Sequence, residues 1–475
     1  MHHYTIRYNG EIGTKDKATR WKLINLLVRN IGKAIQTHFG KEISQASIIK
    51  GKWDITHVQC QEEITELLKT VAGISNFQKV LEHDYEGLEK MAEVASEHFL
   101  PIMKGKSFAV RCRREKGKYP IKSKDVEIAI GNKLYKDGKV NLTSPEVTCA
   151  IEVNPEKFFL SSKNYKGPGG FPVGSQGKAL TLISGGFDSP VAAWKIYKNG
   201  IDQDFVYFDL GGDVQRNCIQ ASVQHLVRNY GHGTKGRLNM VNFLPVMKVI
   251  LKAPTPFQNM ILKYSFYQVA SMLADDFQAS ALVTGESLGQ VSTQTLKNLS
   301  VLDHQTPYLI LRPVSTMDKN EIMAISRAIE THDLAYSGPE LCSIAGKGVV
   351  TGTNSKKFAK ALAEVKEELD QVLNMVAQQK ETFDPFLWEQ PKNIFTSIPE
   401  GYEVIDLREK DDQFPKIKSS DSQDFQKAMM EFHHWDRDKK YFLVCNVGSQ
   451  SAILANAMKH EGFEVEHLTG GAQAL

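Results

Sequence analysis

The stretch Lys178–Gly200, KALTLISGGFDSPVAAWKIYKNG, constrains the fold of this chain more than any other. A short apolar strand runs into the glycine-rich turn S-G-G-F-D-S, and an amphipathic helix follows. Ser189 suits the N-cap, Pro190 the first helical position, and Gly200 the position just past the helix. Backbone N–H groups in such a turn converge on one point, and the helix dipole adds to their effect. The stretch therefore predicts an anion site, one that differs from the G-x-x-x-x-G-K-[ST] phosphate loop.

The S-G-G-F-D-S turn resembles the pyrophosphatase-type loop (PP-loop), S-G-G-x-D-S, of enzymes that split ATP between its α- and β-phosphates. We expect backbone groups of this turn to cradle pyrophosphate and Asp188 to help hold Mg²⁺ on the phosphates, without a metal cage built from protein alone. The other residues expected around the phosphates are Ser184, Gly185, Gly186 and Ser189.

Between about residues 179 and 350, strand-like runs (TLIS, DFVYFDL, LNMVNFLPV, ALVTGES, LILRPV) alternate with helical runs. This alternation predicts a doubly wound, mostly parallel sheet with helices on both faces, in which ligands bind beyond the carboxyl ends of the strands. The S-G-G-F-D-S turn falls at such an end. After ALVTGES, we expect Gly285, Gly289, Gln290 and Gln294 to approach a base and ribose, because glycine lets backbone come close.

Splitting ATP at its α-phosphate also needs positive charge near the developing oxyanion. Lys263, on a helix expected to face the sheet, and Lys319, in the helix start TMDKNEI, are candidates. Their spacing alone favours the alternative that both are solvated lysines.

A second chemical motif lies near the C-terminus. Cys445 ends the strand YFLV and opens the loop C-N-V-G-S-Q-S, which leads into a helix whose N-terminus favours a thiolate. The loop, the first-strand motif VIDLRE with Asp406 and Arg408, and the ending GFEVEHLTGGAQA resemble a rhodanese domain, in which the loop cysteine carries a persulfide. Asn446 and Gln450 stand where rhodanese loops often carry Arg, which weakens anion binding. The alternative is a buried structural cysteine.

Charge is distributed unevenly along the 475 residues. Residues 1–180 hold 29 Lys and Arg against 20 Asp and Glu, or +9, which leaves −6 for the remainder of the net charge of +3. The stretch from Arg111 to Lys124 holds seven basic residues and one acidic residue. A basic front half predicts a polyanionic partner. We expect phosphate contacts with RNA from Arg111, Arg113, Arg114, Lys116 and Lys118.

No run approaches 18 uninterrupted apolar residues and the N-terminus lacks an apolar signal core, so we expect a cytoplasmic protein without a membrane partner. The six cysteines form no C-x-x-C pair, which argues against a zinc knuckle. Cys60, Cys112, Cys149 and Cys218 are expected to be mostly small buried residues, although the sequence leaves their roles open.

Taken together, LISGGFDSP, ALVTGESLGQVSTQTL, PELC and the C-terminal cysteine loop resemble the tRNA 4-thiouridine synthetase family, also linked to thiamine biosynthesis. The resemblance covers nearly the whole chain. It implies a multidomain α/β and α+β fold, with a ferredoxin-like domain (1–58), a THUMP RNA-binding domain (59–166), a PP-loop ATP domain (167–354), a helix and linker (355–400) and a rhodanese domain (401–475).

The resemblance also assigns roles to residues. ATP contacts carry over to Leu182, Ile183, Lys263, Gly285 and Gln294, and activity depends on Asp188 and Lys319. Cys445 matches the persulfide cysteine and Cys342, in the segment PELC, its disulfide partner. We expect the 4-keto oxygen of a uridine at tRNA position 8 to be adenylated and then replaced by sulfur from Cys445.

The implied partners are tRNA, a cysteine desulfurase as sulfur donor, a sulfur-carrier protein of thiazole synthesis and a cellular reductant; a homodimer is left open. The main alternative is a persulfide relay for thiazole synthesis with little role in tRNA. A PP-loop ligase that aminates would need an ammonia source, and no glutaminase domain is visible. The intact S-G-G-F-D-S turn disfavours a non-catalytic RNA binder.

Overall fold

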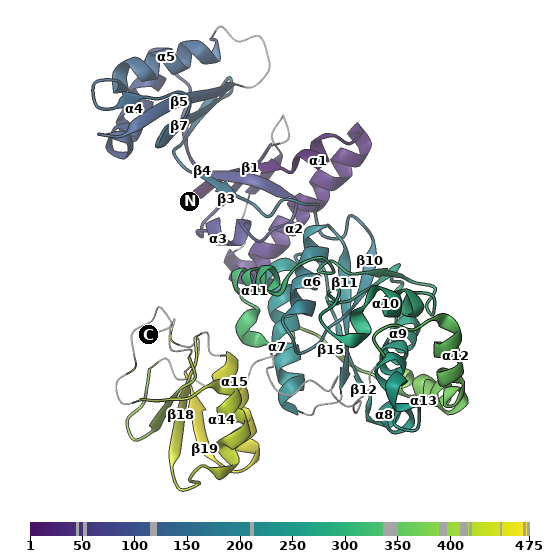
Figure 1. The fold of residues 1–475 in the computed structure, drawn as a ribbon. Helices are drawn as coiled ribbons and strands as arrows, with labels where there is room; N and C mark the ends of the chain where they lie inside the picture. Colours follow the sequence, from purple (N-terminus) through teal and green to yellow (C-terminus); the bar gives the residue numbers. More distant parts are fainter. Residues whose placement is uncertain are drawn as a thin grey trace. The chain divides into compact units, whose positions relative to one another are not determined.

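The computed structural model describes residues 1–43, 47–50, 55–114, 121–209, 213–335, 350–388, 397–408, 417, 420–446, 449–468 and 472. The chain separates into two compact units, Met1–Ser175 with Lys198–Gly200 and Gln176–Tyr197 with Ile201–Leu475 (Figure 1). A nine-stranded sheet organises the first unit, and two mainly parallel sheets of six and four strands organise the second.

The N-terminal part of the first unit has β-α-β-β-α-β order. Its elements are β1 (His2–Tyr8), α1 (Gly10–Gly13), α2 (Lys17–Ile43), β2 (Ser47–Lys50), β3 (Ile55–Cys60), α3 (Thr65–Leu68) and β4 (Ile74–Asp84). The strands follow the order β2-β3-β1-β4 with antiparallel pairs, and Leu27 and Ile31 of α2 are fully buried in their shared core. This is the predicted ferredoxin-like arrangement, and it extends past the predicted boundary at residue 58 because β4 completes the sheet.

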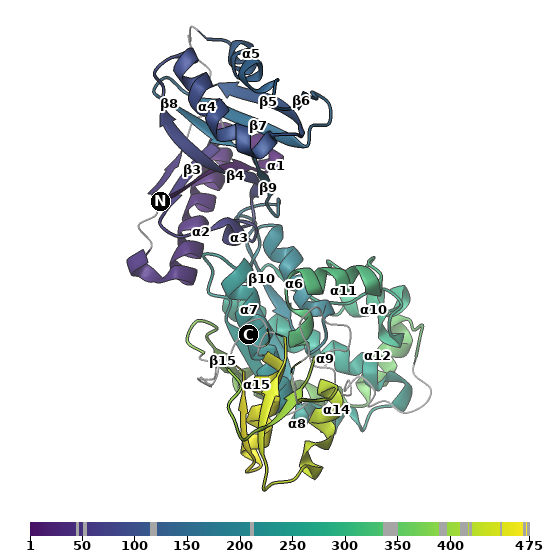
Figure 2. The ribbon, with the colours of Figure 1, turned by 90° about the vertical axis from the view of Figure 1, so that its left-hand side faces the viewer.

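Strand β4 also begins the second half of the same sheet. Its residues up to Val80 pair with β1, and residues 81–84 pair with β8. The elements that follow are α4 (Leu88–Met103), β5 (Ser107–Arg114), α5 (Ser123–Leu134), β6 (Lys139–Val140), β7 (Val147–Val153), β8 (Lys157–Ser161) and β9 (Asn164–Lys166). Figure 2 shows α4 and α5 covering one face of these strands, with Phe99, Phe108 and Ile130 in the core between them.

The six-stranded sheet of the second unit is doubly wound, as predicted. Its strands are β10 (Lys178–Leu182), β11 (Asp202–Asp209), β12 (Leu238–Asn242), β13 (Ala281–Val283), β14 (Leu309–Leu311) and β15 (Glu381–Phe383), in the order β14-β13-β10-β11-β12-β15. All neighbours are parallel except β12 and β15. The chain moves outward from β10 in one direction through β12, then returns to the other side of β10 with β13. The ends of β10 and β13 therefore form a topological switch point, where such sheets bind ligands.

Helices cover both faces of this sheet (Figure 1). They are α6 (Asp188–Lys198), α7 (Asp213–Tyr230), α8 (Leu244–Ile250), α9 (Gln258–Phe277), α10 (Leu296–Asp303), α11 (Lys319–Ala328), α12 (Ser355–Ala363) and α13 (Lys366–Gln378). One predicted strand, LNMVNFLPV, is too long, because α8 begins at Leu244 with Pro245 in its first turn, where proline is well accommodated.

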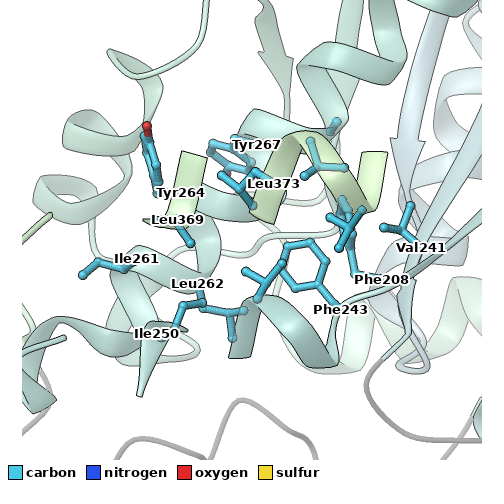
Figure 3. Close-up of a cluster of buried hydrophobic side chains, with 14 of the residues drawn as sticks. Phe208, Val241, Phe243, Ile250, Ile261, Leu262, Tyr264, Tyr267, Leu369 and Leu373 are labelled. Carbon is cyan, nitrogen blue, oxygen red and sulfur yellow. The ribbon is translucent and has the colours of Figure 1, made fainter. Parts of the chain in front are cut away.

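Helices α12 and α13 belong to the core of this domain. The sequence suggested a charged helix and a linker from residue 355, but Leu369 and Leu373 of α13 are fully or almost fully buried in the cluster that contains Phe243 and Leu262 (Figure 3). Strand β15 then adds to the sheet beside β12. The compact nucleotide domain therefore continues to at least Phe383.

The C-terminal part is a small α/β unit with a parallel sheet, as predicted. Its elements are β16 (Glu403–Asp406), β17 (Ser420–Ser422), α14 (Phe425–Glu431), β18 (Lys440–Val444), α15 (Ser449–His460) and β19 (Glu464–His467). The strand order is β17-β16-β18-β19. Among the residues described above, no helix has the length and apolar character needed to cross a bilayer.

Candidate active site

The S-G-G-F-D-S turn connects β10 to α6 and is closed by Ser189. The backbone N–H of Ser184 donates to Ser189 Oγ over 2.9 Å, and the two hydroxyl oxygens lie 3.0 Å apart. The predicted N-cap role of Ser189 is wrong, because α6 begins at Asp188, two residues before Pro190, the predicted first helical residue. The serine hydroxyl instead holds the start of the turn against the start of the helix. Gly200 follows α6 with a φ of +85°, as a helix stop requires.

A cavity of about 280 Å³ opens beside this turn. It lies at the switch point, between the ends of β10 and β13, with α9 forming one wall. The predicted site residues that line it are Leu182, Ile183, Ser184, Gly185, Gly186, Asp188, Ser189, Lys263, Gly285, Gln290 and Gln294. Three separate segments of the chain thus bring these predicted residues together around one space.

Gly285 allows two backbones to meet at the edge of the cavity. A Cβ atom at this position would lie 2.6 Å from the backbone nitrogen of Ser189 and 2.7 Å from its Cα. The sequence predicts that this glycine lets the backbone come close to a ligand. The structure gives a more local reason, which is that the first turn of α6 packs directly on the segment after β13.

Lys263 is held in a buried charge network. Its ammonium pairs with Glu286, and Glu286 also accepts from Arg312 Nε at 2.8 Å, the Tyr267 hydroxyl at 2.7 Å and the Thr284 hydroxyl at 3.0 Å. Burial opposes ionisation of Glu286, but the charges of Lys263 and Arg312 outweigh it and lower its pKa to about 2. The side chain of Lys263 is 16% exposed, so the solvated alternative does not hold for this lysine.

Lys319 has a different environment. It lies exposed in the first turn of α11 and does not line the cavity. Its ammonium nitrogen is 5.8 Å from the centroid of the Phe187 ring, in the S-G-G-F-D-S turn. The structure therefore places Lys319 next to the turn and outside the cavity that holds Lys263.

Aromatic side chains also line the cavity. Tyr207 and Phe208 end β11, and Phe266 and Tyr267 lie on α9. The rings of Phe208 and Phe266 stack with centroids 4.6 Å apart and planes 14° from parallel. Figure 3 shows Phe208 and Tyr267 within the large buried cluster of this domain.

Sequence reasoning missed these aromatic residues as well as Glu286 and Arg312. The strand DFVYFDL did place two aromatic residues at a carboxyl strand end, and Glu286 directly follows the glycine that was identified. Neither signal could reveal the ion pairs of Glu286, because Arg312 reaches it only through the pairing of β13 with β14.

The chemistry of the residues that line the cavity suits an adenine nucleotide. The aromatic side chains can pack against a base, and the glycine turn with the first turn of α6 offers N–H groups to phosphates. The buried Oε1 atom of Gln294 has no hydrogen-bond partner among the described residues, so it is available to a donor on a ligand.

Cys445 lies at the end of β18 and is 1% exposed. Its sulfur accepts from the backbone N–H of Ser451 at 3.4 Å and is 3.3 Å from the Ser451 hydroxyl, in the first turn of α15. Asn446 follows it, half-buried, and Gln450 lies in the same helix turn as Ser451. Cys342 lies outside the described residues, so its predicted pairing with Cys445 stays a prediction.

The VIDLRE motif ends in a buried ion pair. Arg408 Nε and Nη2 donate to the two carboxylate oxygens of Asp406 at 2.8 and 2.7 Å, and both residues are less than 9% exposed. This pair fixes the end of β16, the neighbour of β18. The ion pair of Asp406 and Arg408 therefore has a structural role within the C-terminal domain.

The other described cysteines are free thiols. Burial raises the pKa of Cys112 to about 11 and the pKa values of Cys149 and Cys218 to about 12. A thiol with so high a pKa is a poor nucleophile at neutral pH. These values favour structural roles for the three residues.

The basic stretch begins on β5. Arg111, Arg113 and Arg114 are exposed at the end of this strand. Arg111 donates to the backbone oxygen of Leu142, and Arg114 Nη1 to that of Ile121 at 3.1 Å, so part of their donor capacity is used within the domain. Lys116 and Lys118 lie outside the described residues.

Comparison with known proteins agrees with this architecture. The family described as "Thiamine biosynthesis protein (ThiI)" matches residues 174–369, and the THUMP domain matches residues 85–163. Proteins called tRNA sulfurtransferase from Proteus mirabilis and Pectobacterium carotovorum are 32% and 31% identical, over 97% of this chain and 98% of their own lengths. A crystal structure described as a 4-thiouridine synthetase–RNA complex with bound ATP matches with a TM-score of 0.71 and 26% identity, over 81% of this chain and 99% of that one.

Proposed function

This chain belongs to the tRNA sulfurtransferase family, and from that premise we propose that it converts a uridine of tRNA, at position 8, to 4-thiouridine at the expense of ATP. The observation that carries the proposal is the cavity at the β10–β13 switch point, where a PP-loop turn, Lys263 and Gln294 lie around one space with aromatic side chains. The structure that this fold resembles is described as a 4-thiouridine synthetase with bound ATP, which supports assigning the cavity to a nucleotide.

ATP is the second substrate of this reaction, and it makes an unreactive carbonyl oxygen a good leaving group. Backbone N–H groups of residues 184–189 would hold the pyrophosphate end, and Asp188 would help to hold Mg²⁺ on the phosphates. Lys263 supplies positive charge as the uridine oxygen attacks the α-phosphate and pyrophosphate departs. Glu286 and Arg312 keep the lysine in place.

Sulfur delivery is assigned to the C-terminal domain. A cysteine desulfurase loads Cys445 as a persulfide, whose outer sulfur forms a bond to uridine C4 while AMP leaves with the former carbonyl oxygen. The Cys342 thiolate then attacks the inner sulfur, and the two thiols are oxidised to a disulfide while the transferred sulfur is reduced. A cellular reductant reopens the disulfide. For this step the two cysteines must come within a disulfide's Cα separation of roughly 4.4–6.8 Å.

Replacing Cys342 by Ser tests this sequence of steps. Because Cys342 acts in the release of sulfur and the reset of the enzyme, we expect C342S to lose multiple turnover while ATP binding is unchanged. Continued multiple turnover at the wild-type rate would remove the disulfide from the scheme. The change of Cys149 to Ser, a buried thiol with a raised pKa, is the matched control.

A second function is favoured by the family description, which names thiamine biosynthesis. We propose that the Cys445 persulfide also passes sulfur to a sulfur-carrier protein for thiazole synthesis. This relay uses the C-terminal domain alone. An Asp188→Ala variant should therefore retain thiazole formation while losing tRNA thiolation.

A further inference from the structure

The proposed chemistry uses the residues on both sides of Phe187 but leaves its side chain without a role. Gly186 and Asp188 line the nucleotide cavity, and the Phe187 ring between them is half-buried. The ring of His332 lies nearly parallel to it, with centroids 6.5 Å apart and planes inclined by 22°. Lys319 Nζ lies 5.8 Å from the centroid of the same ring. An aromatic ring, an imidazole and an ammonium thus gather at the turn, beside the cavity.

The three side chains come from separate segments that are fixed relative to the cavity. Lys319 lies in the first turn of α11, where Asp318 and Glu321 form a reciprocal cap. The residues just before that helix are tied to the cavity wall, since the N–H of Leu288 donates to the oxygen of Ser315 at 3.0 Å and the Ser287 hydroxyl donates to the oxygen of Met317 at 3.1 Å. The cluster therefore keeps its place next to the expected phosphates.

The substrate needs such a surface. A uridine inside a folded RNA must leave its stack before its 4-oxygen can reach a phosphate, and enzymes that extrude a base hold it against aromatic side chains. A phenyl ring offers a stacking face to any base. An ammonium has three donors and no acceptor, so it matches carbonyl oxygens, of which uracil has two, and mismatches an amino group.

We propose that Phe187, with Lys319 and His332, forms the subsite that receives the unstacked uracil ring. This inference rests on the proposed function and names the substrate-binding surface that the function requires. Phe187 supplies the stacking face, and Lys319 donates to a carbonyl oxygen of the base. The subsite adjoins the cavity through Gly186 and Asp188, so a stacked uracil lies next to the turn that is expected to hold the phosphates.

The first test compares Phe187→Leu with Phe187→Tyr. Leucine keeps an apolar side chain and removes the aromatic face, whereas tyrosine keeps the face. We expect F187L to slow tRNA-dependent pyrophosphate release in a single turnover by about 10- to 100-fold, and F187Y to remain within threefold of the wild-type rate. The dissociation constants for ATP and for tRNA should stay unchanged in both. Equal rates for the leucine variant and the wild type would overturn the subsite.

A second test does not depend on turnover. A synthetic tRNA that already carries 4-thiouridine at the target position is bound to the full-length protein and irradiated in the near ultraviolet, and the crosslinked peptide is mapped by mass spectrometry. A crosslink to Phe187, Lys319 or His332 supports the subsite, and a crosslink confined to other segments contradicts it. A wild-type enzyme that releases no pyrophosphate with tRNA would refute the proposed function instead, while this crosslink would still test the subsite.

Discussion

At the scale of single residues, Glu286 is the group on which the arrangement of the nucleotide cavity most depends. It is 6% exposed and forms ion pairs with both Lys263 and Arg312. Removing one partner of a buried ion pair leaves uncompensated charge, which typically costs 3–5 kcal/mol. An exposed pair is worth far less.

We therefore expect Glu286→Gln to lower the free energy of unfolding by about 3 kcal/mol, measured by urea unfolding of the full chain. Asp303→Asn is the matched control, because Asp303 pairs with the same Arg312 but is 42% exposed, and its cost should be below about 1 kcal/mol. Equal effects of the two changes would contradict the burial argument.

The same residue predicts a pH dependence. The pKa of Glu286 is lowered from 4.5 to about 2 in the folded protein. A lowered carboxyl pKa contributes stability that is complete above pH 4.5 and is lost as the pH falls toward 2. The stability difference between the wild type and Glu286→Gln should therefore shrink between pH 4.5 and the acid limit of folding. A stability difference that stays constant over this range would show that Lys263 and Arg312 do not lower the pKa of Glu286.

Residues of this kind mark the limit of prediction from sequence. Asp188, Lys263, Gly285 and Gln294 could be identified because they stand in or near local strand–glycine–helix patterns. The ion pairs of Glu286 could not, since they require knowing that β13 lies beside β14. The sequence identifies Ser189 but predicts the wrong contact for it, because α6 begins two residues earlier than predicted and the hydroxyl then bonds to Ser184.

At the scale of elements, the close contact between α6 and the segment after β13 shapes the site. Gly285→Ala would place a methyl group 2.6 Å from the backbone of Ser189, so the segment after β13 and the first turn of α6 must move apart. We expect the affinity for ATP, measured by calorimetry, to fall by about tenfold or more, because overpacking costs typically 1–3 kcal/mol.

Gly352→Ala serves as the control for this change. Among the described residues, a Cβ atom there would come within 4 Å of Lys297 Cδ alone, at 3.5 Å, which is an ordinary contact. ATP affinity should not change in this variant. An unchanged affinity in Gly285→Ala as well would mean that the packing of α6 on this glycine does not shape the nucleotide site.

Helix α13 shows why elements are easier to predict than their partners. The prediction of helix from residue 355 is confirmed. Leu369, Leu373 and Val376 lie on one face of α13, at helical spacing. Sequence patterning shows that such a face is apolar but not what it covers. In the structure it covers α8 and α9 of the nucleotide domain.

At the scale of the whole molecule, tRNA and ATP are predicted to bind to different parts of the chain. The exposed arginines of β5 belong to the first unit and the cavity to the second. Replacing Arg111, Arg113 and Arg114 by Gln should weaken tRNA binding and reduce the salt dependence of the affinity by up to about 0.9 per lost phosphate contact. ATP affinity should remain unchanged. Filter binding over a range of salt concentrations measures both the tRNA affinity and its salt dependence. An unchanged slope of tRNA affinity against salt concentration would refute the predicted RNA surface.

The central claim is that the uridine oxygen leaves as part of AMP. The most direct measurement supplies the enzyme, ATP and a persulfide donor with a tRNA whose target uridine carries oxygen-18 at position 4, followed by mass spectrometry of the released AMP. The account predicts one oxygen-18 atom in AMP for each 4-thiouridine formed. Unlabelled AMP alongside thiolated RNA would contradict it.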